Sequence, residues 1–343
     1  MGEVAETGGG RARSTIIRAP NHLGDVVLAL PALVAEGSDV LVVRGLAPIL
    51  EMALGRGRVC SFERGFRGWR AAVGVLRRRD YQRGMLMTPS FSAAWMLRWG
   101  GVGELRGTTT DARGWLLRDR IDAAELWSLH RINQYRLLLG QGTDAEPISH
   151  RLEVPGPLVE RWSGELRDGS RRLVGLFPGA NAPARRWPLE RFAALAKARA
   201  EAGDHVVVIG GPGERDQTAR VAAAAPGIVD LGGRTGIDDL AAVLAVVDLL
   251  VTNDTGPMHL AGAVGTPTVS LWGSSDPKEV RQTGAPDFGV TGADLPCKPC
   301  YRNHCPRKGA GTLLADAHEE CMKLIDIDDV AAATERALQE TAR

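Results

Sequence analysis

The chain has 343 residues, of which 44% are hydrophobic and 24% are charged, so its composition is that of a globular protein and not of a disordered one. The 42 Lys and Arg residues nearly balance the 41 Asp and Glu residues. A net charge of +1 gives no general attraction to nucleic acid, so any anion site must be built locally. No apolar run approaches the roughly 20 residues of a membrane span. Residues 1–13 are Gly-rich and polar, and we expect a flexible tail there and not an export signal.

Short apolar runs alternate with helical patterns from residue 14 onward. We expect strands at residues 14–18, 40–43, 83–87 and 103–107. We expect helices at residues 26–34, 69–78 and 92–99. This alternation predicts βαβ units and a parallel sheet.

The pattern breaks at residues 141–157, which are rich in Gly, Pro and polar side chains. We therefore predict two domains, residues 14–160 and 161–343, a division that fits roughly 150 residues per domain. Two α/β domains of similar size bind ligands in the cleft between them, at the carboxyl ends of the strands.

Strand–helix alternation resumes after the break. We expect strands at residues 173–177, 205–209, 228–231, 249–251 and 268–271. We expect helices at residues 158–166, 188–202, 214–224, 237–246 and 327–342. The last helix could pack on its own domain or return to the N-terminal domain.

The densest candidate site is the run NDTGPMHLA at residues 253–261, between an apolar strand and a helical stretch. The first helical amides, near Thr255 and Gly256, would be unpaired, and with the helix dipole they would bind an anion such as a diphosphate. His259 lies one turn into the helix. The alternative is an ordinary helix capped by Asp254 or Thr255. A helix cap alone would not require the sequence Thr-Gly-Pro-Met-His, so we favour the anion site.

A second candidate, FPGANAPARRWP at residues 177–188, also joins a strand to the start of a helix. Arg185 and Arg186 would face the same cleft, and Asn181 lies in the same turn. An arginine there can bind a diphosphate with two hydrogen bonds and offset the charge on a departing phosphate. The alternative is that these arginines are solvated surface side chains.

A third candidate is the turn GGPG at residues 210–213, followed by Glu214. A carboxylate at a strand end often accepts hydrogen bonds from ribose hydroxyl groups. Glu214 could equally be a favourable charge in a first helical turn. Thr235, in a later turn of this domain, is a further candidate for binding the donor.

The turn NHLGD at residues 21–25 lies in the N-terminal domain. Gly24 permits a tight turn, and Asp25 stands at the start of a helix that faces the cleft. A carboxylate there could take a proton from an attacking hydroxyl group. Local physics alone favours Asp25 as a helix cap.

Four cysteines gather near the C-terminus, namely Cys297, Cys300, Cys305 and Cys321. Four thiols can hold zinc tetrahedrally, and His304 and His318 could compete as ligands. A structural knot, a reduced thiol cluster and a zinc or iron–sulfur site all remain open. Five cysteines in so long a chain argue against a disulfide-stapled secreted domain, and Cys60 is interpreted as a buried apolar residue.

In their order along the chain, these motifs resemble those of the ADP-heptose:lipopolysaccharide heptosyltransferases, glycosyltransferase family 9. The resemblance runs from about residue 16 to residue 330. It rests on NHLGDVVLALPAL, SFSAAWMLRWGGVGELRGTTTDARGWLL, FPGANAPARRWP, VVIGGPGE, DTGPMHLAGAVGTPTVSLWG and CKPCYRNHC. The second and the last of these are most similar to the heptosyltransferase II branch. The resemblance implies two Rossmann-like domains in the GT-B arrangement, with the acceptor on the first and the sugar nucleotide on the second.

The resemblance also implies roles for the donor-side residues. The DTGxxH segment binds the diphosphate of the sugar nucleotide in this family, and it corresponds to Asp254, Thr255, Gly256 and His259. The basic residue that contacts phosphate corresponds to Arg185, where the family usually has Lys. Arg can bind the same phosphates with a different fork geometry. The Glu that binds ribose corresponds to Glu214.

The Asp of the family's LGD motif is the proposed catalytic base, and it corresponds to Asp25. Asp25 would deprotonate the acceptor hydroxyl group as it attacks the anomeric carbon on the face opposite ADP, which inverts the configuration. Arg185 and the amides near Thr255 and Gly256 would stabilise the departing ADP. This chemistry needs no catalytic cofactor. A metal at the cysteine cluster would therefore be structural.

We expect the N-terminal domain to bind the acceptor through a cluster of basic residues: Arg113, Arg118, Arg120, His130 and Arg131. Phosphorylated lipopolysaccharide core sugars would suit such a patch, although a solvated charged face is the plain alternative. A lipid-linked acceptor would place a cytoplasmic enzyme peripherally at the inner membrane.

Two other functions remain open on the sequence. A glycosyltransferase of the same fold could act on a small natural product, and a non-catalytic protein could bind a sugar nucleotide. An NAD-dependent oxidoreductase is excluded because no GxGxxG follows the first strand.

Overall fold

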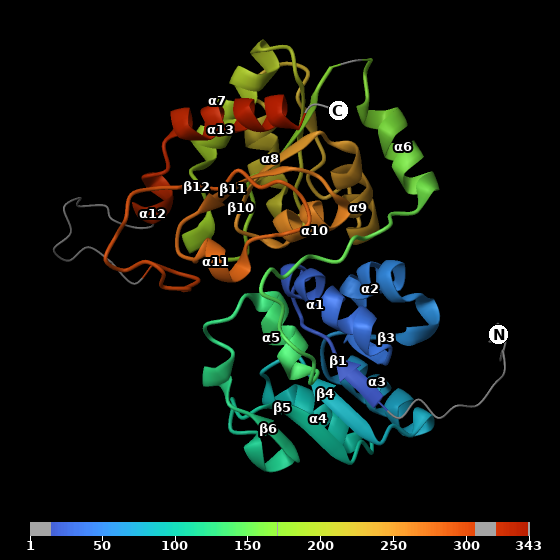
Figure 1. Ribbon diagram of the computed structural model, residues 1–343. Helices are drawn as coiled ribbons and strands as arrows, with labels where there is room; N and C mark the ends of the chain where they lie inside the picture. The colour runs from blue at the N-terminus through green and yellow to red at the C-terminus, as the bar shows by residue number, and fades with distance from the viewer. Residues whose placement is uncertain (1–14, 170, 306–319, 342–343) are drawn as a thin grey trace.

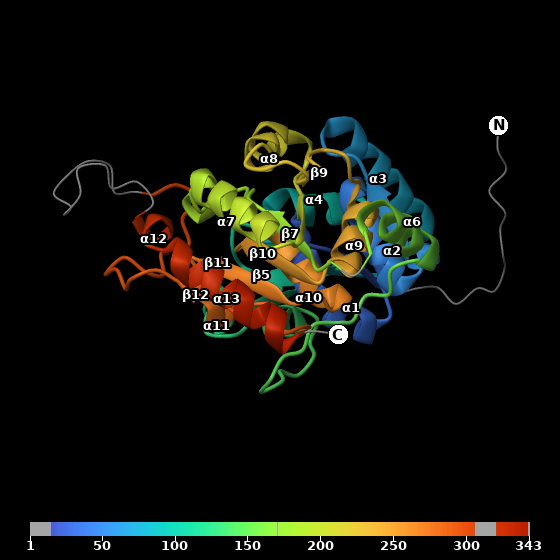
Figure 2. The same cartoon turned by 90° about the horizontal axis from the view of Figure 1, so that it is seen from above.

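The computed structural model describes residues 15–169, 171–305 and 320–341. They form two α/β domains, with the N-terminal domain below the C-terminal one in Figure 1 and both seen from above in Figure 2. The predicted tail at residues 1–13 and His318 lie outside the described residues.

The N-terminal domain is a parallel six-stranded sheet with the strand order β3-β2-β1-β4-β5-β6. Its strands are β1 (Thr15–Arg18), β2 (Asp39–Val43), β3 (Val59–Phe62), β4 (Arg83–Leu86), β5 (Glu104–Thr108) and β6 (Asp119–Ile121). Its helices are α1 (Leu23–Glu36), α2 (Ala47–Leu54), α3 (Phe66–Arg79), α4 (Phe91–Trp99) and α5 (Arg131–Leu138). Short 3-10 turns lie at η1 (Arg44–Leu46), η2 (Arg56–Arg58), η3 (Gly114–Leu116) and η4 (Ala123–Glu125).

The C-terminal domain is a second parallel six-stranded sheet with the order β12-β11-β10-β7-β8-β9. Its strands are β7 (Leu173–Phe177), β8 (His205–Val208), β9 (Val229–Asp230), β10 (Leu249–Asn253), β11 (Thr268–Trp272) and β12 (Val290–Thr291). Its helices are α6 (Gly156–Leu166), α7 (Leu189–Glu201), α8 (Arg215–Ala222), α9 (Ile237–Val246), α10 (Gly256–Val264), α11 (Pro277–Val280), α12 (Glu320–Lys323) and α13 (Ile327–Glu340), with 3-10 turns η5 (Pro183–Arg185) and η6 (Pro212–Glu214).

The two sheets have the same topology. When the strands of each domain are counted in chain order, both read 3-2-1-4-5-6, the order of the Rossmann fold. The order reverses between β1 and β4 in the first sheet and between β7 and β10 in the second. Open parallel sheets bind ligands outside the carboxyl ends of their strands at this reversal. The prediction of two Rossmann-like domains is confirmed, and it marks the turns after β1, β7 and β10 as the places for a site.

The division between the domains lies near the start of α6. Helix α6 packs on α9 of the C-terminal domain, and Trp162 donates a hydrogen bond of 3.0 Å to Asp239. The expected boundary at residues 160 and 161 falls inside this helix, so we place the boundary before Gly156. Helix α13 packs on β10, β11 and α7. Its side chains Val330, Ala333 and Leu338 are buried there, so this helix does not return to the N-terminal domain as was considered.

The expected strands agree with β1, β2, β4 and β5 and with β7 to β11. The sequence missed β3, β6, β12, α2, α5, α11 and α12. Strand β6 is three residues long with two exposed side chains, and α5 has the mostly polar sequence RINQYRLL, so neither has a clear apolar period. None of the helices in the described part of the chain has the length and apolar character needed to cross a bilayer.

Candidate active site

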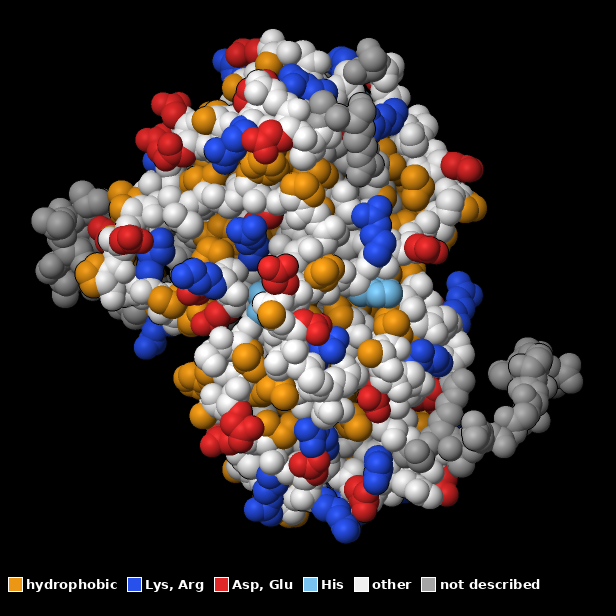
Figure 3. Space-filling model, in the orientation of Figure 1, with side chains coloured by type: hydrophobic (Ala, Val, Ile, Leu, Met, Phe, Trp, Pro, Cys, Tyr) orange, Lys and Arg blue, Asp and Glu red, His pale blue; other side chains and the backbone are white. Residues whose placement is uncertain are grey.

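A cavity of about 810 Å³ lies between the two domains. Its walls come from the β1–α1 turn and the start of α5, and from the turns after β7, β8 and β10. Figure 3 shows the narrow waist where the two lobes meet, with histidine, other basic and acidic side chains along it. The residues expected to act as base and to bind the donor all line this one cavity: Asp25, Asn181, Arg185, Glu214, Thr235, Asp254, Thr255, Gly256 and His259.

The N-termini of α1 and α10 meet across the domain interface. A Cβ atom on Gly24 would lie 2.7 Å from Cδ2 of His259, and one on Gly256 would lie 2.9 Å from Cβ of Leu23. Real Cβ atoms do not approach other atoms so closely. Glycine is therefore required at both positions because the two helix ends touch there.

Asp25 faces the cavity from the first turn of α1. The helix begins at Leu23, with His22 at the cap position and no side-chain cap hydrogen bond, so Asp25 does not serve as the cap. Instead its Oδ1 accepts a hydrogen bond of 2.8 Å from the hydroxyl group of Tyr135 on α5. The sequence did not point to Tyr135, because nothing local links it to a residue 110 positions away.

Tyr135 is a fixed hydrogen-bond donor to this carboxylate. Its burial raises the pKa of the hydroxyl group well above the ordinary value, and the charge of Asp25 raises it further, while Arg131 opposes the shift. The phenol therefore stays protonated at any physiological pH. Its hydrogen bond orients one oxygen of Asp25.

His259 is buried at the domain interface behind Gly24. Burial lowers the pKa of the imidazole to about 4, against the opposing effect of the Asp25 charge. The side chain is therefore neutral at pH 7. Its buried Nδ1 has no hydrogen-bond partner among the described residues.

The turn between β10 and α10 presents a helix N-terminus to the cavity. Thr255 occupies the cap position in an extended conformation, and its side chain makes no cap hydrogen bond. The next residue, Gly256, lines the cavity, and Pro257 has no N–H group. The Thr255 side chain therefore does not cap the helix, contrary to one alternative from the sequence. A helix N-terminus left open in this way suits an anion.

Arg185 lines the cavity from η5 and pairs with the residue that follows β10. Its Nη1 lies 3.2 Å from Oδ2 of Asp254, which is buried and also accepts a hydrogen bond of 2.6 Å from the Ser275 hydroxyl group. The Nε of Arg185 is buried without a partner among the described atoms. A buried carboxylate would repel a diphosphate, so we do not expect Asp254 to contact one directly. Its ion pair instead holds the guanidinium of Arg185 in position.

Asn253 connects the two loops that carry these groups. Its side chain donates to the carbonyl of Pro178 at 2.9 Å and accepts from the backbone N–H of Trp187 at 3.0 Å. It thereby fixes both ends of the loop that contains Asn181 and Arg185. Asn253 is wholly buried, so it acts through the loop and not on a ligand.

Glu214 lies over the carboxyl end of β7. Its Oε2 accepts a hydrogen bond of 2.7 Å from the backbone N–H of Gly211, so the first-turn role suggested by the sequence is present. The carboxylate occupies the space that a side chain on Gly179 would need, 1.7 Å from an ideal Cβ. Both Glu214 and Thr235 line the cavity.

The cysteine-rich loop forms part of the cavity wall. Tyr301 and Asn303 line the cavity, and the Asn303 carbonyl accepts a hydrogen bond of 3.1 Å from the backbone N–H of Ala184, next to Arg185. All five cysteines are free thiols. Burial raises the pKa of Cys321 to about 11, so this thiol is protonated at pH 7. Within residues 15–169, 171–305 and 320–341, no group of three or more His, Cys, Asp or Glu side chains is placed to hold a metal ion.

The expected acceptor cluster does not stay together. Arg113 is fully buried, and its guanidinium donates to the carbonyls of Thr108 and Thr88 at 2.9 and 2.6 Å. Arg118 pairs with Glu104 at the amino end of β5, which is the opposite end of the sheet from the cavity. Arg120 is exposed on β6 and does not line the cavity. Arg113 is thus a structural residue, and the other two point to a different surface.

His130 and Arg131 do reach the domain interface. Arg131 lines the cavity, and its buried Nε has no partner among the described atoms. His130 caps α5 by accepting from the backbone N–H of Ile132, and its Nε2 lies 3.0 Å from the Arg281 carbonyl of the other domain. His130 therefore joins the domains, while Arg131 is available to a ligand.

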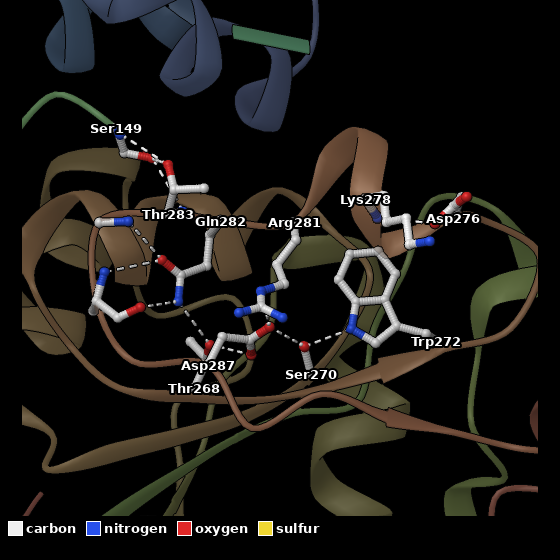
Figure 4. Close-up of polar contacts among 12 residues, drawn as sticks. Ser149, Thr268, Ser270, Trp272, Asp276, Lys278, Arg281, Gln282, Thr283 and Asp287 are labelled. Carbon is white, nitrogen blue, oxygen red and sulfur yellow. Dashed lines mark hydrogen bonds and ion pairs between the residues drawn. The ribbon is translucent and has the colours of Figure 1, made fainter. Parts of the chain in front are cut away.

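The loop that receives His130 is held by a buried polar network (Figure 4). Asp287 accepts hydrogen bonds from Thr268 and Ser270 at 2.7 and 2.8 Å and pairs with Arg281 at 3.5 Å. Ser149, in the segment between the domains, bonds to Thr283 of the same loop at 3.1 Å. This network fixes the position of the Arg281 carbonyl and hence one contact between the domains.

Comparison with known proteins identifies relatives of the chain. Residues 69–310 match the sequence model of glycosyltransferase family 9 (heptosyltransferase). The chain is 30% identical over 223 residues to lipopolysaccharide heptosyltransferase 2 of Escherichia coli K12, covering 59% of this chain and 62% of the relative. It is 28% identical to lipopolysaccharide heptosyltransferase 1 of Pseudomonas aeruginosa, covering 83% and 85%. The match thus spans less than two thirds of the E. coli relative.

The fold has a close counterpart among solved structures. The E. coli ADP-heptose lipopolysaccharide heptosyltransferase II superposes with a TM-score of 0.77 at 21% identity, over 95% of this chain and 99% of the other. This likeness confirms the GT-B arrangement that the sequence motifs implied.

Replacing Gly24 by Ala should destabilise the protein through the interface. The added methyl group would meet His259 Cδ2 at 2.7 Å, and overpacking of this kind typically costs about 1–3 kcal/mol. Urea denaturation measures the change. Gly164→Ala, where nothing lies within 4 Å of the added Cβ in helix α6, is the matched control and should be neutral or stabilising. Equal stability of Gly24→Ala and the native protein would contradict the close contact.

His259 should make stability depend on pH below neutrality. The unfolded chain takes up a proton near the ordinary pKa of 6.5, whereas the folded protein does so only near 4. The free energy of unfolding should therefore fall as the pH falls through this window, by up to about 1.4 kcal/mol per pH unit from this group. His259→Gln should flatten the dependence in urea denaturation at a series of pH values, and an unchanged slope would refute the assignment.

Proposed function

Because the chain belongs to glycosyltransferase family 9, we propose that it transfers a heptose from ADP-heptose to a hydroxyl group of the lipopolysaccharide inner core. The observation that carries this proposal is a single cavity between two Rossmann-like domains. One wall presents the carboxylate of Asp25, and the opposite wall presents Arg185 and the N-terminus of α10. The relatives named above are enzymes that act on lipopolysaccharide.

The C-terminal wall of the cavity is the proposed donor site. The diphosphate would lie between Arg185 and the backbone of Thr255 and Gly256, where the helix dipole and the guanidinium both favour negative charge. The unpartnered Nε of Arg185 supports this placement, because a buried donor needs a hydrogen-bond acceptor. Glu214 would accept hydrogen bonds from the ribose hydroxyl groups, and Asn181 and Thr235 would line the remaining wall.

The proposed reaction is a single displacement. Asp25 takes the proton of the acceptor hydroxyl group while its oxygen forms a bond to the anomeric carbon. The bond between that carbon and the phosphate oxygen breaks on the opposite face, and its electron pair leaves with ADP. The configuration is therefore inverted. Arg185 and the amides at Thr255 and Gly256 offset the charge that develops on the leaving group.

The acceptor would enter from the N-terminal domain. Arg131 is the one residue of the expected cluster that lines the cavity with a free donor, so we retain it as an acceptor-binding candidate. A lipid-linked acceptor would hold the enzyme peripherally at the cytoplasmic face of the inner membrane. We propose that this contact is made by an aromatic face of α3, α4 and η3, defined by Phe66, Trp69, Phe91, Trp95, Trp99 and Trp115.

The aromatic face has the chemistry of a membrane interface. Phe66, Trp99 and Trp115 are 73%, 48% and 66% exposed. The five rings other than Phe66 contact one another in pairs, with centroids 5.8 to 6.3 Å apart. Residues 64–79, which include α3, contain six arginines and no acidic residue. Tryptophan prefers the headgroup region of a bilayer, and arginine is attracted to anionic lipids.

Replacing Asp25 by Asn tests the proposed base. The variant keeps the shape of the side chain and an oxygen that can accept from Tyr135, but it cannot take a proton. We expect transfer from ADP-heptose to lipopolysaccharide core acceptors to fall by about 10²–10⁴, as measured by mass spectrometry of the products. The affinity for ADP, measured by calorimetry, should stay close to that of the native protein.

Tyr135→Phe gives the graded comparison for this experiment. It removes only the hydrogen bond that orients Asp25, so the rate should fall less than in Asp25→Asn, with ADP affinity again unchanged. If Asp25→Asn turned over like the native enzyme, Asp25 would not be the base. Loss of ADP binding in either variant would instead indicate a disturbed cavity.

The double variant Phe66→Ser/Trp115→Ser tests the aromatic face. We expect the native protein to sediment with vesicles rich in phosphatidylglycerol and the variant to do so several-fold less, because two exposed rings are lost from the interface. Trp127→Ser is the matched control, since Trp127 is 75% exposed but lies outside the aromatic face. Equal sedimentation of the double variant and the control would exclude this surface.

A further inference from the structure

The cysteine-rich loop, residues 297–305, closes one end of the cavity between the domains. The sequence pointed to this loop for its thiols, yet the residues that it brings to the cavity are Tyr301 and Asn303. The proposed contacts to ribose, diphosphate and acceptor use neither of them. The loop therefore adds a wall to the cavity that those contacts do not explain.

The backbone of the cysteine-rich loop is anchored where Tyr301 reaches the cavity. The N–H groups of Cys300 and Tyr301 both donate to the carbonyl of Ser274, at 2.9 and 3.0 Å. Tyr301 has a φ of 52°, in the left-handed region that residues with large side chains rarely adopt. Such a conformation persists only where the surrounding structure holds it, and it is most common at functional sites. The fold therefore keeps this tyrosine at the cavity against its local preference.

Tyr301 and Asn303 offer different groups to a ligand. Partial burial raises the pKa of the Tyr301 hydroxyl group, and a hydrogen bond to Glu279 of α11 raises this pKa further. Because the hydroxyl group is occupied by the protein, Tyr301, which is 40% exposed, offers its ring. Asn303 is exposed and offers its side-chain amide, since its contact with Ala184 uses the backbone carbonyl.

The order of the strands indicates which part of the donor lies beside this loop. Glu214, the proposed ribose ligand, belongs to the turn after β8, Arg185 to the turn after β7, and Gly256 to the turn after β10. In the sheet these strands lie in the order β11-β10-β7-β8. The diphosphate of ADP-heptose links the ribose to the heptose. A donor that runs from β8 to β10 therefore continues toward β11, and Ser274, which anchors the cysteine-rich loop, follows β11.

The N-terminal domain places the proposed base near the same strand end. Tyr135 of α5 donates to Asp25, and His130 at the start of α5 contacts the carbonyl of Arg281. Five residues of helix separate His130 from Tyr135, a rise of about 7.5 Å. Arg281 directly follows α11, in the segment after β11 (Figure 4). A sugar whose anomeric carbon faces Asp25 would therefore lie beside this segment.

We propose that Tyr301 and Asn303 bind the sugar that is transferred, the ring of Tyr301 against its C–H face and the amide of Asn303 on its hydroxyl groups. This inference rests on the proposed transferase function and adds two residues to the donor site. An aromatic ring beside a hydrogen-bonding group suits a body that is apolar on its faces and polar at its edges, as a sugar ring is. The cysteine-rich loop would then supply contacts that distinguish the sugar nucleotide from ADP.

Calorimetry with ADP and with ADP-heptose, without acceptor, measures these contacts. Both ligands contain the nucleoside and the diphosphate, so a change in the ratio of the Kd for ADP to the Kd for ADP-heptose reports on the sugar. Tyr301→Ala and Asn303→Ala should each lower this ratio about fivefold, as the loss of one hydrogen bond or ring contact allows. The affinity for ADP should stay unchanged. Tyr301→Phe should keep most of the ratio, because the ring remains.

Arg302→Ala is the matched control. Arg302 lies between the two residues and is exposed, but it does not line the cavity, so neither affinity should change. An unchanged ratio in both Tyr301→Ala and Asn303→Ala would overturn the proposal. An equal loss of affinity for ADP and ADP-heptose would also overturn it, because the loop would then act on the whole donor site through Ala184.

The native protein separates this proposal from the function on which it rests. If the native protein transfers heptose from ADP-heptose while the ratio is the same in all four variants, the sugar contacts fail alone. If the native protein binds ADP and has no affinity for ADP-heptose, the proposed function fails, and the sugar contacts fail with it.

Discussion

The contact between the N-termini of α1 and α10 is the constraint on which the site depends. Gly24 and Gly256 allow the two helix ends to touch across the domain interface. The same contact buries His259, and burial keeps its imidazole neutral. The proposed base and the proposed leaving-group site line one cavity because the two domains approach this closely. The glycines thus serve the geometry of the cavity and not only the local turns.

The repeated topology explains why these residues meet. Each domain has the same strand order, and each reverses that order at one pair of central strands. The turns after β1, β7 and β10 therefore leave the sheets at their ligand-binding edges. When the two edges face each other, residues more than 200 positions apart in the chain, such as Asp25 and Gly256, line one cavity. Asn253 and the Asp254–Ser275 pair hold in place the loop that carries Arg185.

Motifs that act through the local backbone could be predicted from the sequence. Side-chain partners that only the fold brings together could not. The strands, the Rossmann-like halves and the turns around Asp25 and Gly256 follow from patterns of a few residues. Tyr135 could not be found in this way, because its hydrogen bond to Asp25 joins α5 to α1, and α5 itself has no clear apolar period. The cysteines show the same limit, because a CxxC spacing leaves a thiol cluster and a metal site equally open, and nothing in that spacing indicates that the loop also brings Tyr301 and Asn303 to the cavity.

The two buried arginines of the N-terminal domain show what sequence alone cannot distinguish. Arg113 and Arg18 have the same side chain, nearly the same burial and a pKa lowered to about 10 in each case. Arg113 directs its Nε and both terminal nitrogens to oxygen atoms of its own loop and the next, and it lines neither the cavity between the domains nor a smaller cavity of the N-terminal domain that Arg18 lines. Arg18 leaves its Nε unused beside this smaller cavity, which lacks acidic side chains. The two arginines therefore differ in the hydrogen bonds that they make, and not in burial or charge.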